Sequence, residues 1–201
     1  EILMTQGISE KDALLATDAL IKADLRGVES HGVSNMLRAY LGAFKSNSLN
    51  PKPNWKIVKE TASCATINSD NGLGIVVAPQ AMEIAVEKAK KTGAGIVTMN
   101  NCGHLGMLAY HSMIASDNDM IGTTMAACSP RMVPTYSSVR ALGTNPISYS
   151  APADKLPDFV FDAAMTSVAG NKIVLASRLN VPLSPGWIAD KDGNPIMEEV
   201  N

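Results

Sequence analysis

Apolar residues recur at helical spacing through the first quarter of the chain. In ISEKDALLATDALIKADL they return every three to four residues behind Ser9, which predicts a helix over residues 9–25 with Ser9 as its N-cap. RGVESHGV interrupts this period with two glycines, and SNMLRAYLGAF then resumes it over residues 33–44. The pattern therefore predicts two helices joined by a glycine turn.

The pattern changes character after a polar, proline-marked connection. WKIVKE and SCATINSD alternate loosely between apolar and polar residues, which is typical of strands. VAPQAMEIAVEKAKKTG has the period of an amphipathic helix that closes at Gly93, and AGIVTMNN follows as a short apolar strand. A helix that leads into a strand is the signature of the α/β class.

The second half of the chain is less regular. NCGHLGMLAYHSMIASDNDM is interpreted as a loop that opens a helix, and MIGTTMAA and FVFDAAM as strands. Residues 129–158 are rich in proline and show little periodicity, so we expect a long irregular segment there. Such segments in compact domains more often have a function than not. DKDGNP predicts a turn near the end of the chain.

Composition and charge narrow the class of protein. Of the 201 residues, 46% are hydrophobic and 18% charged, as in a folded globular protein. The net charge of −2 supplies no basic surplus for nucleic acid or an anionic membrane, and no apolar run reaches the ~18 residues of a membrane span. The three cysteines are scattered without CxxC spacing. We expect a cytoplasmic protein that binds neither nucleic acid nor membranes.

The stretch ESHGVSNMLRAY is the first candidate for chemistry. A fixed histidine exchanges protons near neutral pH, and helical spacing places Asn35 one turn beyond His31 and Arg38 one turn beyond Asn35. An arginine fork suits the carboxylate of a small organic acid. The alternative is that Ser30 caps the helix, His31 is solvated and Arg38 pairs on the surface.

A second histidine lies in NNCGHLGMLAYH, directly after an apolar strand. In α/β folds, ligands often bind at the loops beyond the carboxyl ends of strands. The glycines beside His104 would let the backbone lie close to such a ligand. His111, seven residues on, has the spacing of an ordinary helix-face residue. The segment does not match HExxH, so a metal site has weak support.

The usual phosphate loops are missing from the sequence. There is no GxGxxG after a strand, and NGLGIVVAP offers only a GxG that opens a helix, so a bound dinucleotide would not use the Rossmann fingerprint. GTNP predicts a rigid turn, and Asp162 ends a short apolar strand. That carboxylate either accepts hydrogen bonds from ribose hydroxyls or caps a helix.

Several of these motifs, taken in order, resemble the malate/L-lactate/ureidoglycolate dehydrogenase family, type-2 NAD(P)-dependent oxidoreductases that include sulfolactate dehydrogenases. The resemblance runs from residue 23 to 195 and rests on ADLRGVESHGV, INSDNGLG, AMEIAVEKAKKTGAG, NNCGHLG, LGTNPISYSAP, FDAAMTSVAGNKI and PGWIADKDGNP. It implies an α/β fold distinct from Rossmann, in which a mixed-sheet cofactor domain lies beside a helical portion, usually as a homodimer. It further implies hydride transfer between NAD or NADP and C2 of a 2-hydroxy or 2-oxo acid.

The resemblance also assigns roles to residues. It implies that His104 is the general acid/base and that His31 lines the same site. We expect Ser30, Asn35 and Arg38 on the substrate side. The cofactor positions that it implies are Ser129, Thr144, Asn145, Asp162, Ala163 and Ala164. Many members have an arginine where this chain has Asn35, which leaves carboxylate binding to Arg38 or to another group.

The resemblance also bears on domain organisation. Family members continue well past PGWIADKDGNP, so we expect this chain to be a fragment of a longer protein. Residues 1–50 would form a helical portion shared with the remainder, and residues 51–201 the cofactor-binding domain. Two other hypotheses remain: a truncated, non-catalytic paralogue that binds a partner, and a histidine-metal hydrolase.

Overall fold

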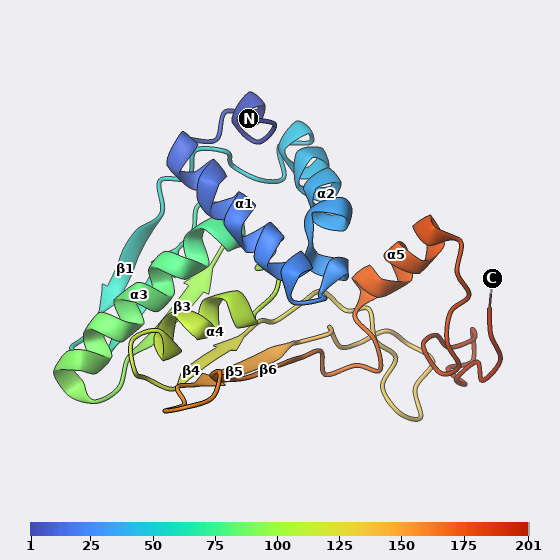
Figure 1. Cartoon of the computed structure of the whole chain (residues 1–201). Helices are drawn as coiled ribbons and strands as arrows, with labels where there is room; N and C mark the ends of the chain where they lie inside the picture. The colour runs from blue at the N-terminus through green and yellow to red at the C-terminus, as the bar shows by residue number, and fades with distance from the viewer. Residues whose placement is uncertain (201) are drawn as a thin grey trace. The chain divides into compact units, whose positions relative to one another are not determined.

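The computed structural model describes residues 1–200, which form helices and two small sheets (Figure 1). In chain order the elements are η1 Met4–Gln6, α1 Glu10–Leu25, η2 Glu29–His31, α2 Val33–Lys45, β1 Lys56–Glu60, β2 Cys64–Asn68, α3 Gly74–Thr92, β3 Ile96–Asn100, α4 Ala109–Ser116, β4 Gly122–Met125, β5 Ile147–Ala151, β6 Phe159–Ala163 and α5 Gly170–Leu179. Residues 1–124 and 149–161 make one compact unit, and residues 125–148 with those from 162 onward make a second.

The two N-terminal helices confirm the prediction from apolar spacing. Ser9 is the N-cap of α1, and its hydroxyl accepts a hydrogen bond from the amide of Asp12 at 3.2 Å. The buried face of α1 is made mostly of alanines, which let neighbouring elements approach closely, whereas α2 contributes the larger side chains of Met36, Tyr40 and Phe44. These faces form the main apolar core of the first unit.

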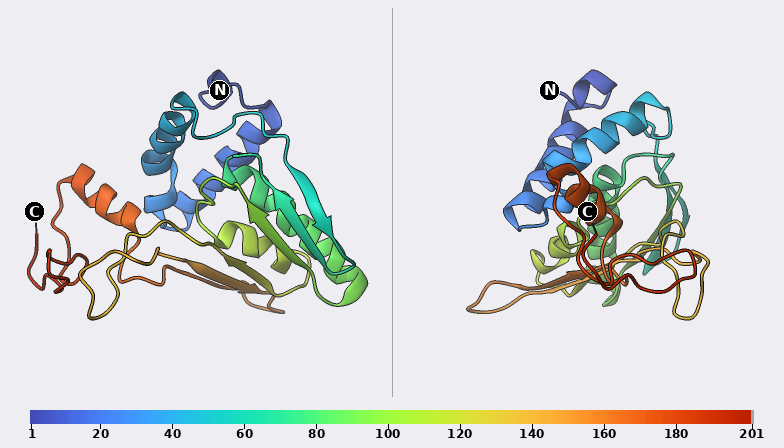
Figure 2. Two further views of the ribbon diagram at one scale, coloured as in Figure 1. Left: turned by 180° about the vertical axis from the view of Figure 1, so that it is seen from behind. Right: turned by 90° about the vertical axis from the view of Figure 1, so that its right-hand side faces the viewer.

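A mixed sheet supports the other half of the first unit. β1 pairs with β2 in antiparallel register, and β2 pairs with β3 in parallel register, in the order β1-β2-β3. Viewed from behind, the teal and green strands lie in front of α3 (Figure 2). Ile67 of β2 and Val77 of α3 have no exposed surface and pack together with Ala81. The prediction of an α/β fold with a mixed sheet is confirmed.

The longest helix, α3, begins directly after the GxG turn at Gly74. Its first six residues are all buried, so an unbroken apolar run replaces the amphipathic period there. Pro79, which lacks a backbone N–H, lies within this buried part. The helix ends as predicted at Gly93, whose φ of 85° is the left-handed conformation that glycine adopts at low cost.

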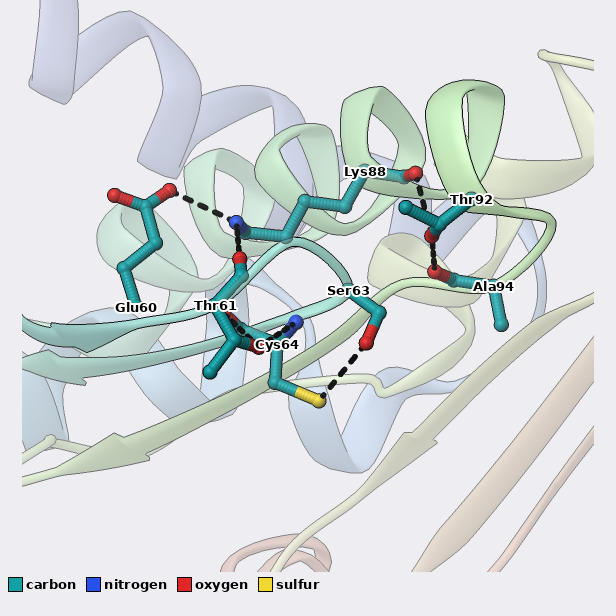
Figure 3. Close-up of polar contacts among 7 residues, drawn as sticks. All are labelled: Glu60, Thr61, Ser63, Cys64, Lys88, Thr92 and Ala94. Atoms are coloured by element: carbon teal, nitrogen blue, oxygen red, sulfur yellow. Dashed lines mark hydrogen bonds and ion pairs between the residues drawn. The ribbon is translucent and has the colours of Figure 1, made fainter.

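A buried lysine on α3 fixes the turn between β1 and β2 (Figure 3). The ammonium group of Lys88 donates to Oε1 of Glu60 and to the carbonyl oxygen of Thr61, each at 2.8 Å. The Lys88 side chain is only 10% exposed. Thr61 in turn accepts the amide of Cys64 on its hydroxyl at 3.0 Å. Two hydrogen bonds from Lys88 therefore tie the turn to the helix.

The second sheet has the order β4-β5-β6, and the boundary between the two units passes through its strands. The expectation of an irregular segment over residues 129–158 is wrong at β5. There the fully buried positions are Ser148 and Ser150, so an apolar–polar pattern does not reveal the strand. The hydroxyl of Ser150 donates to the carbonyl oxygen of Ser112 at 2.5 Å. Among residues 1–200, no helix has the length and apolar character needed to cross a membrane.

Candidate active site

The loop between β3 and α4 carries His104 beyond the carboxyl end of a parallel strand. Gly106 has a φ of 68°, and a Cβ there would lie 2.6 Å from Cγ2 of Ile75 on α3. A Cβ on Gly74 would overlap the carbonyl oxygen of Gly103. These glycines let the loop lie directly on the first turn of α3, which fixes the backbone on both sides of His104.

His31 is the last residue of η2, directly before α2. Oδ2 of Asp24, from the end of α1, accepts a hydrogen bond from the amide of Val33 at 2.9 Å. The intervening Gly32 lies so close to this carboxylate that a Cβ would overlap it. Asp24 thus satisfies an N-terminal amide of α2, and its negative charge suits that end of the helix.

Two polar residues hold the turn around His31. The hydroxyl of Ser30 lies 2.9 Å from Nδ1 of His31, and the Asn35 amide nitrogen donates to the Ser30 carbonyl oxygen at 2.9 Å. The alternative in which Ser30 caps the helix is wrong, because the N-cap residue is Gly32 and the helix amide is bound by Asp24. Ser30 contacts the imidazole instead, and Asn35 holds Ser30.

The two histidines meet within the first unit. Their ring centroids are 5.5 Å apart and their planes are inclined by 17°, so the imidazoles stack. The hydroxyl of Tyr40, from α2, lies 2.9 Å from Nδ1 of His104, and the amide of Gly106 donates to the same nitrogen at 3.3 Å. His104 is therefore held between a ring from η2 and a hydroxyl from α2.

The phenol that contacts His104 is itself buried. Tyr40 is 2% exposed and belongs to the main core of the first unit. Burial raises the pKa of Tyr40 above its ordinary range, because the phenolate would lose its hydration. The group beside His104 is thus a neutral hydroxyl near neutral pH.

His111 lies on α4, one turn beyond the His104 loop. It is 1% exposed, and its Nε2 donates to the carbonyl oxygen of Leu105 at 2.8 Å. Its Nδ1 has no hydrogen-bond partner among the described residues. Burial lowers the pKa of His111 to about 4, and the hydrogen bond to Leu105 opposes this only in part. The neutral imidazole of His111 anchors the residue next to His104.

The cofactor positions implied by the family resemblance lie in or at the edge of the second unit, in three neighbouring segments. The amide of Cys128, just before Ser129, donates to Oδ1 of Asn145 at 3.0 Å. The amide of Met165, just after Ala164, donates to the carbonyl oxygen of Thr144 at 2.8 Å. The GTNP turn therefore joins the Ser129 segment to the segment that contains Asp162, Ala163 and Ala164. Ser129 and Asp162 are exposed.

Metal ligands do not gather in the described part of the chain. Among residues 1–200, no three histidine, cysteine, aspartate or glutamate side chains lie close enough together to hold an ion. The stacked pair supplies only two nitrogen-bearing rings, and His111 donates to a carbonyl oxygen instead.

Comparison with known proteins places this geometry in a family. Residues 1–198 match the family model described as malate/L-lactate dehydrogenase. The chain belongs to the malate/L-lactate dehydrogenase family. It is 40% identical over 198 residues to L-sulfolactate dehydrogenase of Methanocaldococcus jannaschii, and 39% identical over 193 residues to malate dehydrogenase of Pyrococcus horikoshii. These alignments take in 98% and 96% of this chain.

Solved structures of malate/L-lactate dehydrogenases share the fold. Sulfolactate dehydrogenase from M. jannaschii superposes with a TM-score of 0.87 at 40% identity, over 98% of this chain and 57% of that one. Malate dehydrogenase from Entamoeba histolytica gives a TM-score of 0.92 at 31% identity, over 98% and 54% of the two chains. The chain thus spans little more than half the length of these dehydrogenases.

The first unit of this malate/L-lactate dehydrogenase family member brings together His31, His104, Ser30 and Asn35. The family resemblance, and not the spacing of residues, implied that the two histidines share a site. Arg38 lies on the exposed side of α2. The helical period places it roughly 200° around the helix from Tyr40, whose hydroxyl reaches His104. Its assignment to a substrate carboxylate therefore stays a prediction, as does the division of the chain into residues 1–50 and 51–201.

Two residues that hold the His104 loop, Tyr40 and His111, are not predicted from the sequence. Tyr40 fits the apolar stripe of α2, and nothing in that stripe distinguishes a core tyrosine from one whose hydroxyl reaches a distant loop. His111 has the spacing of a helix-face residue, yet it is buried. The apolar residues around it, from Met107 to Ile114, were the available signal that a histidine there would be desolvated.

Proposed function

We propose that the protein is an oxidoreductase that transfers a hydride between NAD or NADP and C2 of a small 2-hydroxy or 2-oxo acid. The observation that carries the proposal is the stacked pair of His31 and His104, with Nδ1 of His104 held by Tyr40. Family membership supports it, since the relatives compared above are named as sulfolactate and malate dehydrogenases. Those names do not favour the alternative of a non-catalytic binding protein.

His104 is the proposed proton carrier. Reduction of a 2-oxo acid adds a hydride to C2 and a proton to the oxygen, and oxidation reverses both transfers. Histidine is suited to this exchange near neutral pH. Because Tyr40 and Gly106 contact Nδ1, the nitrogen proposed to exchange the proton with the substrate is Nε2. His31, stacked on the same ring, lines the site beside it.

The residues of the second unit fit a nicotinamide cofactor. Its ribose hydroxyls are hydrogen-bond donors, and the exposed carboxylate of Asp162 and the exposed hydroxyl of Ser129 are acceptors that flank the GTNP turn. A Cβ on Gly143 would overlap the carbonyl oxygen of Cys128, so this turn packs tightly against the Ser129 segment. When bound, the nicotinamide supplies or accepts the hydride. The residues proposed to hold it are Ser129, Thr144, Asn145, Asp162, Ala163 and Ala164.

Recognition of the acid is proposed to involve α2. Arg38 is the cation predicted for the substrate carboxylate, and Ser30 and Asn35 form the polar turn beside His31. The proposed substrate class is malate, lactate, sulfolactate or a ureidoglycolate-like acid. We further propose, from the family resemblance, that the protein works as a homodimer in the cytoplasm.

Spectrophotometry of the purified protein tests the proposal. L-malate, L-lactate, L-sulfolactate and ureidoglycolate are each mixed with NAD⁺ or NADP⁺, and the absorbance of the reduced nicotinamide is followed. We expect turnover with at least one pair, and its loss in His104→Ala. Absence of turnover with every pair, together with no binding of either cofactor by calorimetry, would refute the proposal.

A further inference from the structure

We propose that Tyr40 is a positioning residue for His104, whose hydroxyl keeps the imidazole in one orientation both when the ring is neutral and when it is protonated. This inference rests on the proposed function, in which His104 exchanges a proton with the substrate. It concerns a residue of the apolar core that motif spacing did not single out.

Two donors meet at Nδ1 of His104, and they differ in one property. The amide of Gly106, 3.3 Å away, can only donate, so it is compatible with an Nδ1 that offers its lone pair. The hydroxyl of Tyr40, 2.9 Å away, can donate a hydrogen bond or accept one. When Nδ1 carries a proton, the Gly106 contact becomes unfavourable and Tyr40 remains a suitable partner. Tyr40 is therefore the contact that survives protonation of the ring.

Proton transfer at Nε2 requires an acceptor for the proton that stays on Nδ1, and of the two contacts only the Tyr40 oxygen can accept it. In the reducing direction, Nε2–H of the imidazolium gives its proton to the substrate oxygen as the hydride from the nicotinamide reaches C2. The ring is left neutral with its remaining proton on Nδ1, donated to the Tyr40 oxygen. In the oxidising direction, Nε2 takes the hydroxyl proton as the hydride leaves C2. In both directions the Nδ1–H bond stays intact and needs an acceptor.

The environment of Tyr40 suits a fixed partner. The ring is in the core formed by α1, α2 and the first turn of α3, so the hydroxyl cannot swing into solvent without unpacking the helix. A Cβ added to Gly106 would lie 3.8 Å from the Tyr40 oxygen, so the loop passes directly over it. The titratable groups whose rings face His104 are His31 from η2 and Tyr40 from α2.

The test compares Tyr40→Phe with the matched control Tyr110→Phe in the same protein. Each substitution removes the hydroxyl of a buried tyrosine, and that of Tyr110 donates to Oδ2 of Asp18 at 2.7 Å instead of contacting a histidine. With ¹⁵N-labelled histidine, NMR follows the ring nitrogens of the three histidines against pH, assigned by single substitutions. Kinetics on the reactive acid give kcat and KM separately.

In Tyr40→Phe, the imidazolium loses its Nδ1–H acceptor, whereas the neutral ring can carry its one proton on Nε2 and accept the Gly106 amide at Nδ1. We expect His104 to titrate about half to one pH unit lower, the effect of one net hydrogen bond. We expect kcat to fall by up to about tenfold with KM within about twofold. Tyr110→Phe should change neither. An unchanged His104 titration in Tyr40→Phe would overturn the proposal, as would an equal change in Tyr110→Phe.

A measurement on the unmodified protein keeps the inference testable if Tyr40→Phe does not fold. Below the pH at which His104 titrates, its Nδ1–H should exchange with solvent more slowly than an exposed imidazole N–H. Fast exchange would overturn the assignment. If the protein oxidises no acid, the proposed function fails, whereas the titration and exchange data still decide whether Tyr40 holds Nδ1.

Discussion

The imidazole rings of His31 and His104 stack with their centroids 5.5 Å apart, although one ring belongs to the turn before α2 and the other to the loop after β3. Two protonated imidazoles at this distance would repel each other. The pair therefore favours states that carry at most one extra proton. This is the arrangement expected where one histidine exchanges a proton and its neighbour lines the site.

Replacement of His104 by alanine tests the proton-transfer role. We expect kcat to fall by at least about 100-fold, the typical effect of losing a general acid/base. Cofactor affinity, measured by calorimetry in the absence of the acid, should be unchanged, because the proposed cofactor residues lie elsewhere in the chain. A kcat equal to that of the unmodified protein would remove His104 from this role.

Arg38→Lys tests the carboxylate clamp. Lysine keeps the charge but replaces a bidentate fork with a point charge, so KM for the acid should rise by about tenfold with little change in kcat. Arg26→Lys is the matched control, since Arg26 is another exposed arginine, at the end of α1. If KM is unchanged in Arg38→Lys, the carboxylate is bound by a different group.

Because His111 is buried as a neutral imidazole, we expect the protein to lose stability as the pH falls. Burial lowers its pKa in the folded state from 6.5 to about 4, so the unfolded chain binds a proton more readily than the folded protein does. The stability that the neutral His111 contributes to the folded protein is fully present above pH 6.5 and is lost as the pH falls towards 4. The loss amounts to about 3 kcal/mol.

Urea unfolding at a series of pH values measures the effect of His111. His111→Gln keeps an N–H that can donate to Leu105 but does not titrate. Its free energy of unfolding should fall less between pH 6.5 and 4 than that of the unmodified protein. Parallel pH profiles for the two proteins would show that His111 does not set the limit.

Lys88 and Lys90 form a matched pair on α3. Lys88→Ala removes a buried ammonium and leaves the Thr61 carbonyl oxygen without its donor, which should cost about 1–3 kcal/mol of unfolding free energy (Figure 3). Lys90→Ala breaks an exposed ion pair with Glu87, which solvent screens, and should therefore cost less unfolding free energy than Lys88→Ala. If chemical denaturation shows the same loss of unfolding free energy in the two variants, burial of the Lys88 ammonium does not determine its contribution.

The sequence predicts an element well where one side of it is apolar and the other polar. The helix behind Ser9 and the strands on either side of α3 follow such patterns, and all three are present. β5 was missed because its buried positions are serines. α5 was missed because it buries only Ala176 and leaves Val174 and Leu179 half exposed, which blurs the helical period.

The sequence predicts which histidines belong to the candidate site, but not how their side chains contact each other and Tyr40. The glycine-flanked histidines point to His31 and His104 one at a time, and family motifs put them in one site. The stacking of their rings depends on how α2 packs against the His104 loop. The Tyr40 contact spans 64 residues of sequence. No local pattern encodes such a contact, because it follows from tertiary packing.

Ser30, Asn35, Tyr40 and His111, which contact or support the histidine pair, belong to the first compact unit and precede Ser129 in the chain. Chains emerge from the ribosome N-terminus first, and domains fold as units. During synthesis, Ser30, Asn35, Tyr40 and His111 are therefore made before the first residue of the proposed cofactor set. The residues proposed for proton transfer therefore precede those proposed for cofactor binding in the order of translation.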